Sequence, residues 1–255
     1  RTPELALSKH MIDKIAYEDE YHNAIKKQLK VKDDEDYKTV DILDYAKKVA
    51  TSAVDYSVKD VIAVVYAQGE IQGGEGDVNI IGEGAVKRAL KAAREDEDVK
   101  AIVLRVDSPG GSALTSELIW REIEITKKDK PVIVSMGNVA ASGGYYISCN
   151  ADRIFAEPST ITGSIGVFGM LPNMNELGKN IGINAEQVAT HDNAAGYSLF
   201  EPVSEDFKAF TLESIENIYT TFLTRVAKGR KMTTEQVDAI AQGRVWTGTD
   251  ALKNG

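Results

Sequence analysis

One serine of this chain lies among small residues, in the segment 138–146, Asn-Val-Ala-Ala-Ser-Gly-Gly-Tyr-Tyr. Two alanines precede Ser142 and two glycines follow it, so a peptide backbone can approach its hydroxyl. The N–H of Gly143 could face the same reacting carbonyl as an oxyanion donor. These are the surroundings that a nucleophilic serine needs at a turn before a helix. A helix-capping serine fits equally well, because Ala140 breaks the Gly-x-Ser-x-Gly pattern.

Two further segments carry groups that suit the same chemistry. Residues 107–112 read Asp-Ser-Pro-Gly-Gly-Ser, and the N–H groups of Gly110 and Gly111 at a helix start can bind an anion or an oxyanion. A turn that merely needs glycine explains this segment as well. Residues 158–167 are rich in hydroxyls and include Ser164. They form either a wall of an active site or a turn with local hydroxyl-to-backbone bonds.

A general base for Ser142 is harder to find. The sequence has three histidines, of which His10 and His22 lie in a charged segment and are expected at the surface. His191 is the one histidine whose position would suit a base. No two histidines have the spacing of metal ligands on a helix, and a single cysteine, Cys149, makes no zinc cluster. We therefore expect neither a metal nor a cofactor.

The elements that position these residues alternate between strands and helices. This order predicts an α/β fold with a mostly parallel sheet flanked by helices. The loops 107–112 and 137–144 would then lie at the carboxyl edge of the sheet, where such folds carry their chemistry. The expected strands are 61–67, 99–106, 132–136, 153–156 and 184–189, and the expected helices are 82–94, 113–127, 142–149, 204–228 and 233–240.

Helical periodicity also predicts which residues face the core. Val86, Leu90 and Ala93 should point inward from the helix 82–94. Leu114, Leu118 and Ile125 should do the same from the helix 113–127. The strand 61–67 is uniformly apolar and is expected to be buried.

Composition limits the possible functions. Of the 255 residues, 43% are hydrophobic and 27% are charged, which is typical of a globular protein. A formal net charge of −9 repels phosphate backbones and disfavours nucleic-acid binding. The longest strongly apolar run, residues 61–67, is far shorter than the roughly 20 residues that span a bilayer.

The chain divides into two predicted parts. Residues 1–57 form a helical, charged lead-in, in which the charge run 32–36 is expected to be a solvated turn. Residues 58–255 form the domain that bears the serine. The sequence starts on Arg1, which indicates a piece of a longer protein.

Four ordered segments resemble signal peptide peptidase A, or protease IV, a membrane-associated Ser-Lys protease family with a crotonase-like (ClpP-like) α/β fold. The resemblance implies that Ser142 is the nucleophile and that Gly143, with Gly110 or Gly111, donates to the oxyanion. It also implies that Ser164 helps to orient the base. The matching segments are residues 103–112, 135–148, 158–169 and 243–255.

The base of this family is a neutral lysine, which desolvation makes available. In short members it follows the serine, in a segment that matches residues 188–195 here. This chain has no lysine between Lys179 and Lys208. In long members two repeats are fused, and the first supplies the lysine while the second supplies the serine. The resemblance thus implies the C-terminal half of a long, tandem-repeat member, with residues 1–13 as the tail of the preceding repeat.

The implied function is a serine endopeptidase that degrades cleaved signal peptides and similar apolar peptides. The expected partners are the N-terminal half of the same protein and further copies in a tetramer-like ring. An anchor outside this soluble piece would hold it at the bacterial inner membrane, with the catalytic part on the periplasmic side. This chain alone is expected to be inactive. Two alternatives stay open: a crotonase-type acyl-CoA enzyme, and a non-catalytic assembly half in which Ser142 only caps a helix.

Overall fold

The structure is a computed structural model that describes residues 3–32, 35–51, 59–191, 194 and 196–255. Part of the charge run 32–36, residues 33–34, and the neighbours of His191, residues 192–193, lie outside the described residues. The chain divides into two compact units, Arg1–Val58 and Lys59–Gly255. In the part of the chain that the structure describes, we find no helix with the length and apolar character needed to cross a membrane.

The described part of the first unit consists of helices joined by irregular segments. It contains α1 (Pro3–Ser8), α2 (Glu18–Leu29) and α3 (Ile42–Thr51). Acidic residues fill the first turn of α2 and Lys26 and Lys27 its last turn, which suits the helix dipole at both ends. The helical prediction for residues 1–30 is confirmed for α1 and α2, and a non-helical stretch separates them.

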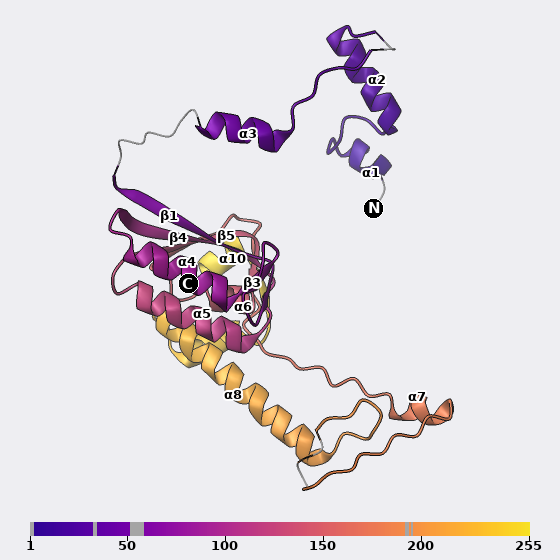
Figure 1. The fold of residues 1–255 in the computed structure, drawn as a ribbon, viewed down its shortest axis with the longest axis vertical. Coiled ribbons are helices and arrows are strands. Elements are labelled where there is room, and N and C mark those ends of the chain that lie inside the picture. The colour runs from indigo at the N-terminus through magenta and orange to yellow at the C-terminus, as the bar shows by residue number, and fades with distance from the viewer. Residues whose placement is uncertain (1–2, 33–34, 52–58, 192–193, 195) are drawn as a thin grey trace. The chain divides into compact units, whose positions relative to one another are not determined.

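The second unit is built on a six-stranded sheet with the order β1-β4-β5-β7-β8, and β6 pairs with β5 (Figure 1). All pairings are parallel except that of β7 with β8. The α/β prediction is therefore confirmed. The strands are β1 (Val61–Gln68), β2 (Glu70–Gln72), β3 (Ile80–Gly82), β4 (Val99–Ser108), β5 (Val132–Ala141), β6 (Arg153–Phe155), β7 (Ile161–Gly163) and β8 (Val245–Thr247). The helices are α4 (Glu83–Glu95), α5 (Ala113–Thr126), α6 (Gly143–Tyr146), α7 (Asn175–Asn180), α8 (Glu205–Arg230), α9 (Thr234–Ile240) and α10 (Gly248–Lys253).

The main core lies between the sheet and the helices α4 and α5, which pack side by side (Figure 1). Alternate residues of β4 point into it, as a strand requires, and α4 contributes the three residues predicted for its inner face. Because these side chains are almost completely buried, they carry much of the hydrophobic stabilisation. The fully or nearly fully buried ones are Val86, Leu90, Ala93, Ile102, Leu104 and Val106.

Leu104→Ala tests this core. Leu104 is 0% exposed, so the substitution should lower the free energy of unfolding by about 2–5 kcal/mol through lost transfer energy and a cavity. Urea unfolding measures the change. Leu252→Ala is the control, because Leu252 is 85% exposed and its loss should cost within about 0.5 kcal/mol. Equal losses in the two variants would contradict this assignment of the core.

The predicted inner face of α5 is wrong. Leu114 is exposed, and Leu118 and Ile125 are only partly buried, whereas Ile119 and Ile123 are fully buried. The apolar residues of α5 are spread over most of its circumference, so their spacing does not define one inward face.

Three strand predictions also change. The strand predicted at 132–136 continues as β5 to Ala141, so residues 137–141 are not a loop. No strand forms at residues 184–189. The strand at 61–67 exists as β1, but it lies at the edge of the sheet and leaves Ile62, Val64 and Tyr66 exposed. An apolar run alone does not distinguish an edge strand from a central one.

Candidate active site

Three of the sequence-predicted segments meet at one edge of the sheet. The strands β4, β5 and β7 are neighbours and run parallel, so their carboxyl ends lie together. The register pairs Ser108 with Ala140 and Ala141 with Gly163. As a result, the turn after β4, Ser142 after β5 and Ser164 after β7 become neighbours, as expected for an α/β fold.

Ser142 occupies a strained junction between β5 and α6. Its backbone angles are φ 51° and ψ −120°, a conformation that costs an L-residue about 1–3 kcal/mol. Two hydrogen bonds hold it there: its N–H donates to Gly163 O at 2.9 Å, and the N–H of Tyr146 donates to its carbonyl at 2.8 Å. Such a strand-to-helix turn presents a serine hydroxyl outward. The side chain makes no capping hydrogen bond, so capping of α6 does not account for Ser142.

Backbone donors lie beside this serine. The Gly110 N–H donates to Ser108 Oγ at 3.1 Å, whereas the amides of Gly111 and Gly143 donate to no other described residue. The two amides are close, since a Cβ added to Gly143 would lie 3.2 Å from the Gly111 nitrogen. The turn can approach so closely only because Gly110 lacks a side chain: a Cβ there would lie 2.6 Å from the Gly143 nitrogen.

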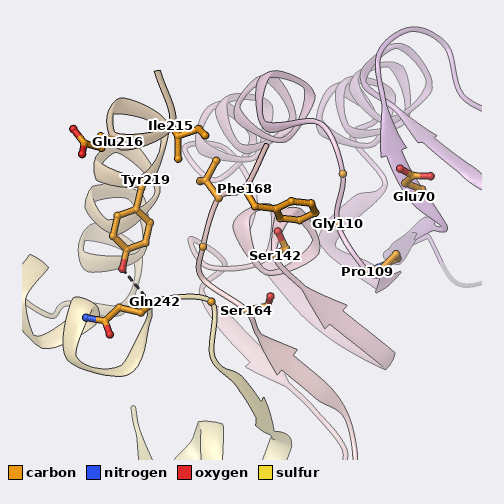
Figure 2. Close-up of a pocket in the computed structure, with 14 residues that line it drawn as sticks. Glu70, Pro109, Gly110, Ser142, Ser164, Phe168, Ile215, Glu216, Tyr219 and Gln242 are labelled. Atoms are coloured by element: carbon orange, nitrogen blue, oxygen red, sulfur yellow. Dashed lines mark hydrogen bonds between the residues drawn. The ribbon is translucent and has the colours of Figure 1, made fainter. Parts of the chain in front are cut away.

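Ser142 opens into a cavity of about 850 Å³ that Ser164 also lines. Figure 2 shows Ser142 and Ser164 near each other, with the Phe168 ring next to Ser142 and Pro109 further along the cavity. A smaller cavity of about 220 Å³ adjoins it, lined by Ser142, Gly143 and mostly apolar side chains. The apolar residues around this smaller cavity include Ala113, Val167, Phe168, Ile215, Ile218 and Phe222.

Ser164 has an unusual backbone like that of Ser142. Its φ is 49°, and its N–H donates to Arg244 O at 2.7 Å. Its hydroxyl makes no hydrogen bond with another described residue, so it can serve a group that enters the cavity.

Among the described residues that line these cavities, none is a lysine or a histidine, and the carboxylates are those of Glu70 and Glu216. His191 is exposed and contacts the Thr190 hydroxyl at 3.1 Å. It does not line either cavity, so the structure does not bring it to Ser142. Among the described residues, we also find no group of three or more His, Cys, Asp or Glu side chains that could hold a metal ion.

The thiol of Cys149 lies near the site but is poorly suited to act as a nucleophile. Cys149 is fully buried one turn beyond α6, and burial raises the pKa of its thiol to about 12. It stays protonated at neutral pH and packs with the second core cluster.

Tyr146 lines the smaller cavity as a fixed, neutral wall. Burial raises the pKa of its phenol, which donates to Glu117 Oε2 at 2.5 Å. Arg225 from α8 binds the same carboxylate through two hydrogen bonds of 3.1 and 2.6 Å. This network links α5, α6 and α8 around the site.

Sequence reasoning missed the wall that α8 provides. Ile215 and Tyr219 line the large cavity, and Ile218 and Phe222 line the small one. The helix itself was predicted, but apolar residues at helical spacing usually indicate core packing. The weak signal was the polar Glu216 and Tyr219 within the apolar stripe.

Comparison with known proteins places this geometry in a family. The sequence profile of peptidase family S49 matches residues 124–255, just over half of the chain, including Ser142 and Ser164. The chain is 46% identical to Protease 4 of Haemophilus influenzae over 213 residues, which is 83% of this chain and 34% of that protein. It is 36% identical to the chloroplastic Serine protease SPPA of Arabidopsis thaliana over 250 residues, 96% of this chain and 37% of that protein.

Among solved structures, a ClpP1 mutant from Listeria monocytogenes is similar, with a TM-score of 0.49 and 15% sequence identity. That match covers 75% of this chain and 86% of the other. The chain spans little more than a third of the length of the two relatives named above. On the family match and these identities, the chain belongs to peptidase family S49.

Proposed function

We propose that this chain is the serine-bearing part of a Ser-Lys endopeptidase that degrades cleaved signal peptides and similar apolar peptides. The observation that carries the proposal is the strained backbone of Ser142 beside the free amides of Gly111 and Gly143, at the mouth of an open cavity. A nucleophile, oxyanion donors and space for a peptide are then present in one place. Residues 58–255 would form the peptidase domain, and residues 1–57 a lead-in that contains the tail of a preceding repeat.

In the reaction, Ser142 Oγ attacks the scissile carbonyl carbon while a neutral lysine accepts the hydroxyl proton. The negative charge on the former carbonyl oxygen is stabilised by the N–H groups of Gly143 and Gly111; Gly110 is the less suitable donor because Ser108 already accepts from it. The C–N bond then breaks, and the lysine returns its proton to the leaving amine. Water attacks the resulting ester, its proton passes through the lysine to Ser142 Oγ, and the carboxylic product leaves.

The base lysine is expected from outside this chain. Among the described residues that line the two cavities, none is a lysine or a histidine. We propose that the N-terminal half of the complete protein supplies the lysine. The lysine would donate an N–H to Ser164 Oγ, which turns the one lone pair of its nitrogen toward the Ser142 hydroxyl.

The walls of the cavities support an apolar substrate. Val167, Phe168, Ile215, Ile218 and Phe222 present apolar surface in the smaller cavity next to Ser142. An apolar peptide side chain gains free energy by leaving water for such a surface.

The resemblance to signal peptide peptidase A extends the proposal to the complete protein. We place it at the bacterial inner membrane with its catalytic part on the periplasmic side, held by an anchor outside this sequence. Further copies would join it in a tetramer-like ring. No cofactor takes part in the proposed reaction.

Complementation tests this function. The chain alone should hydrolyse an apolar fluorogenic peptide no faster than buffer. Addition of the N-terminal half should raise the rate at least about 100-fold, because general acid–base catalysis typically contributes 10²–10⁴-fold. The matched control is the same mixture with Ser142→Ala, which should remain at the buffer rate.

Two outcomes would contradict the proposal. Robust activity of the chain alone that disappears with His191→Ala would make His191 the base. The complete protein can also be treated with a fluorophosphonate, and mass spectrometry then shows whether Ser142 is labelled. Absence of the label would favour the acyl-CoA enzyme instead.

A further inference from the structure

The turn at residues 241–244, between α9 and β8, contributes no reactive group to the proposed mechanism, although it borders the large cavity. Gln242 and Gly243 line the cavity, and Gly243 begins the last of the four segments that define the resemblance. This turn is hydrogen-bonded to the backbone of Ser164 and of its neighbour Ile165.

The turn holds the backbone of Ser164 from both sides. The Ser164 N–H donates to Arg244 O at 2.7 Å, and the Gly243 N–H donates to Ile165 O at 2.9 Å. The two segments are in close contact, since a Cβ on Gly166 would lie 2.8 Å from the Gly243 Cα. Because φ of Ser164 is 49°, this residue needs such bonds to keep its orientation.

Tyr219 of α8 fixes the turn in its place. Its hydroxyl donates to Asp238 Oδ1 at 2.6 Å. It also accepts from the Gln242 N–H at 3.1 Å, the bond drawn in Figure 2. Burial raises the pKa of Tyr219, and the bond to Asp238 raises it further. The phenol is thus neutral and its one hydrogen is committed to Asp238, which leaves Tyr219 unsuited to transfer a proton.

We propose that Tyr219 is a positioning residue that acts on the reaction through the turn 241–244 and Ser164. This rests on the proposed function, in which Ser164 orients the lysine. When Tyr219 loses its hydroxyl, the turn loses its anchor on α8, and the direction of the Ser164 hydroxyl becomes less well defined. The peptide-binding walls stay intact, so the loss falls on catalysis and not on binding.

A double-mutant cycle in the complete protein tests this inference. Tyr219→Phe should lower kcat about five- to twentyfold and leave KM within about twofold. Ser164→Ala should lower kcat further, and adding Tyr219→Phe to it should change kcat by less than about twofold, because both act through one group. In both single variants the ascending limb of the pH profile should move to lower pH, because the Ser164 oxygen accepts more strongly from the ammonium than from the amine, and a lysine without this acceptor is more easily deprotonated.

Two matched variants separate positioning from a structural effect. Asp238→Asn keeps an oxygen acceptor at Oδ1 and should retain kcat within about twofold, whereas Asp238→Ala should behave like Tyr219→Phe. Tyr66→Phe removes an exposed hydroxyl with no hydrogen bond to another described residue and should change nothing.

The outcomes are distinguishable. If Ser164→Ala lowers kcat but Tyr219→Phe leaves it unchanged, this inference fails and the proposed function stands. If the reductions in kcat of the two single variants multiply in the double variant, or if Tyr219→Phe raises KM alone, Tyr219 acts on the peptide and not through Ser164. Either result would also overturn this inference. If Ser164→Ala has no effect, the proposed role of Ser164 fails and the inference fails with it.

Discussion

Ser142→Ala is expected to abolish peptide hydrolysis by the complete protein, lowering kcat by about 10⁴-fold or more, as the loss of a serine nucleophile does in other serine proteases. Alanine has no oxygen to form the ester. Ser164 is the other serine that lines the large cavity among the described residues, and its proposed hydrogen bond to the lysine makes it no substitute. Alanine tolerates the backbone of position 142 about as well as serine, so the fold and peptide binding should persist.

Measurement of kcat and KM with an apolar fluorogenic peptide checks this result, together with a thermal melt to confirm folding. Ser159→Ala is the matched control, because Ser159 is exposed in the segment that also holds Ser164 and does not line either cavity at the site. It should leave kcat within about twofold. Retained activity in Ser142→Ala would place the nucleophile elsewhere and would restore the reading of this domain as a non-catalytic assembly half.

Gly111→Ala should damage both the oxyanion site and the fold. A Cβ at this position would lie 2.1 Å from the Ile71 carbonyl oxygen, a distance that forces the backbone to move. That backbone is pinned by two hydrogen bonds of 2.8 Å: the Ile71 N–H to Gly110 O, and the Ser112 N–H to Ile71 O. Displacing it turns the Gly111 N–H away from the oxyanion, and loss of one such donor typically lowers kcat by about 10²–10³-fold. The broken pairing should also lower the free energy of unfolding by about 2–4 kcal/mol.

The control is Gly196→Ala, because an added Cβ there meets no heavy atom within 4 Å. It should change neither kcat nor the unfolding midpoint appreciably. Steady-state kinetics and urea unfolding of both variants separate the two expected effects. Wild-type activity in a folded Gly111→Ala variant would exclude the Gly111 amide as a donor.

The parts of the site that the sequence predicts are those encoded locally. Ser142 and Gly143 stand in one short segment, and Gly110 and Gly111 in another, so the residue types make them candidates for a nucleophile and its donors, beside a capping serine and an ordinary turn. The preference for Gly111 over Gly110 in the proposed oxyanion site comes from the structure, because the Gly110 N–H donates to Ser108 Oγ. The α8 wall was not predictable, since Ile215, Ile218 and Phe222 have the spacing of ordinary core residues.

In the fold, too, the features with a local sequence signal could be predicted and those that depend on distant contacts could not. The inner face of α4 follows from a clear apolar stripe, whereas α5 has apolar residues on most sides and its face depends on its neighbours. β7 and β8 are three-residue strands whose pairing is long-range, so neither has a local signal. The exposure of β1 follows from its place at the edge of the sheet, which is a property of topology.

The pairing of β7 with β8 affects the order in which parts of the domain can fold during synthesis on the ribosome. Ile161 pairs with Thr247, so this contact closes a long loop and forms late in folding, after the local contacts of β4, α5 and β5. A chain emerges from the ribosome N-terminal part first, and the strained turn at Ser142 can therefore exist before the segment that holds Ser164 in place has been made. Until residues 243–247 have been made, Ser164 lacks the hydrogen bond to Arg244 O that holds its backbone, so the proposed active site can be completed only after nearly the whole domain has been synthesised.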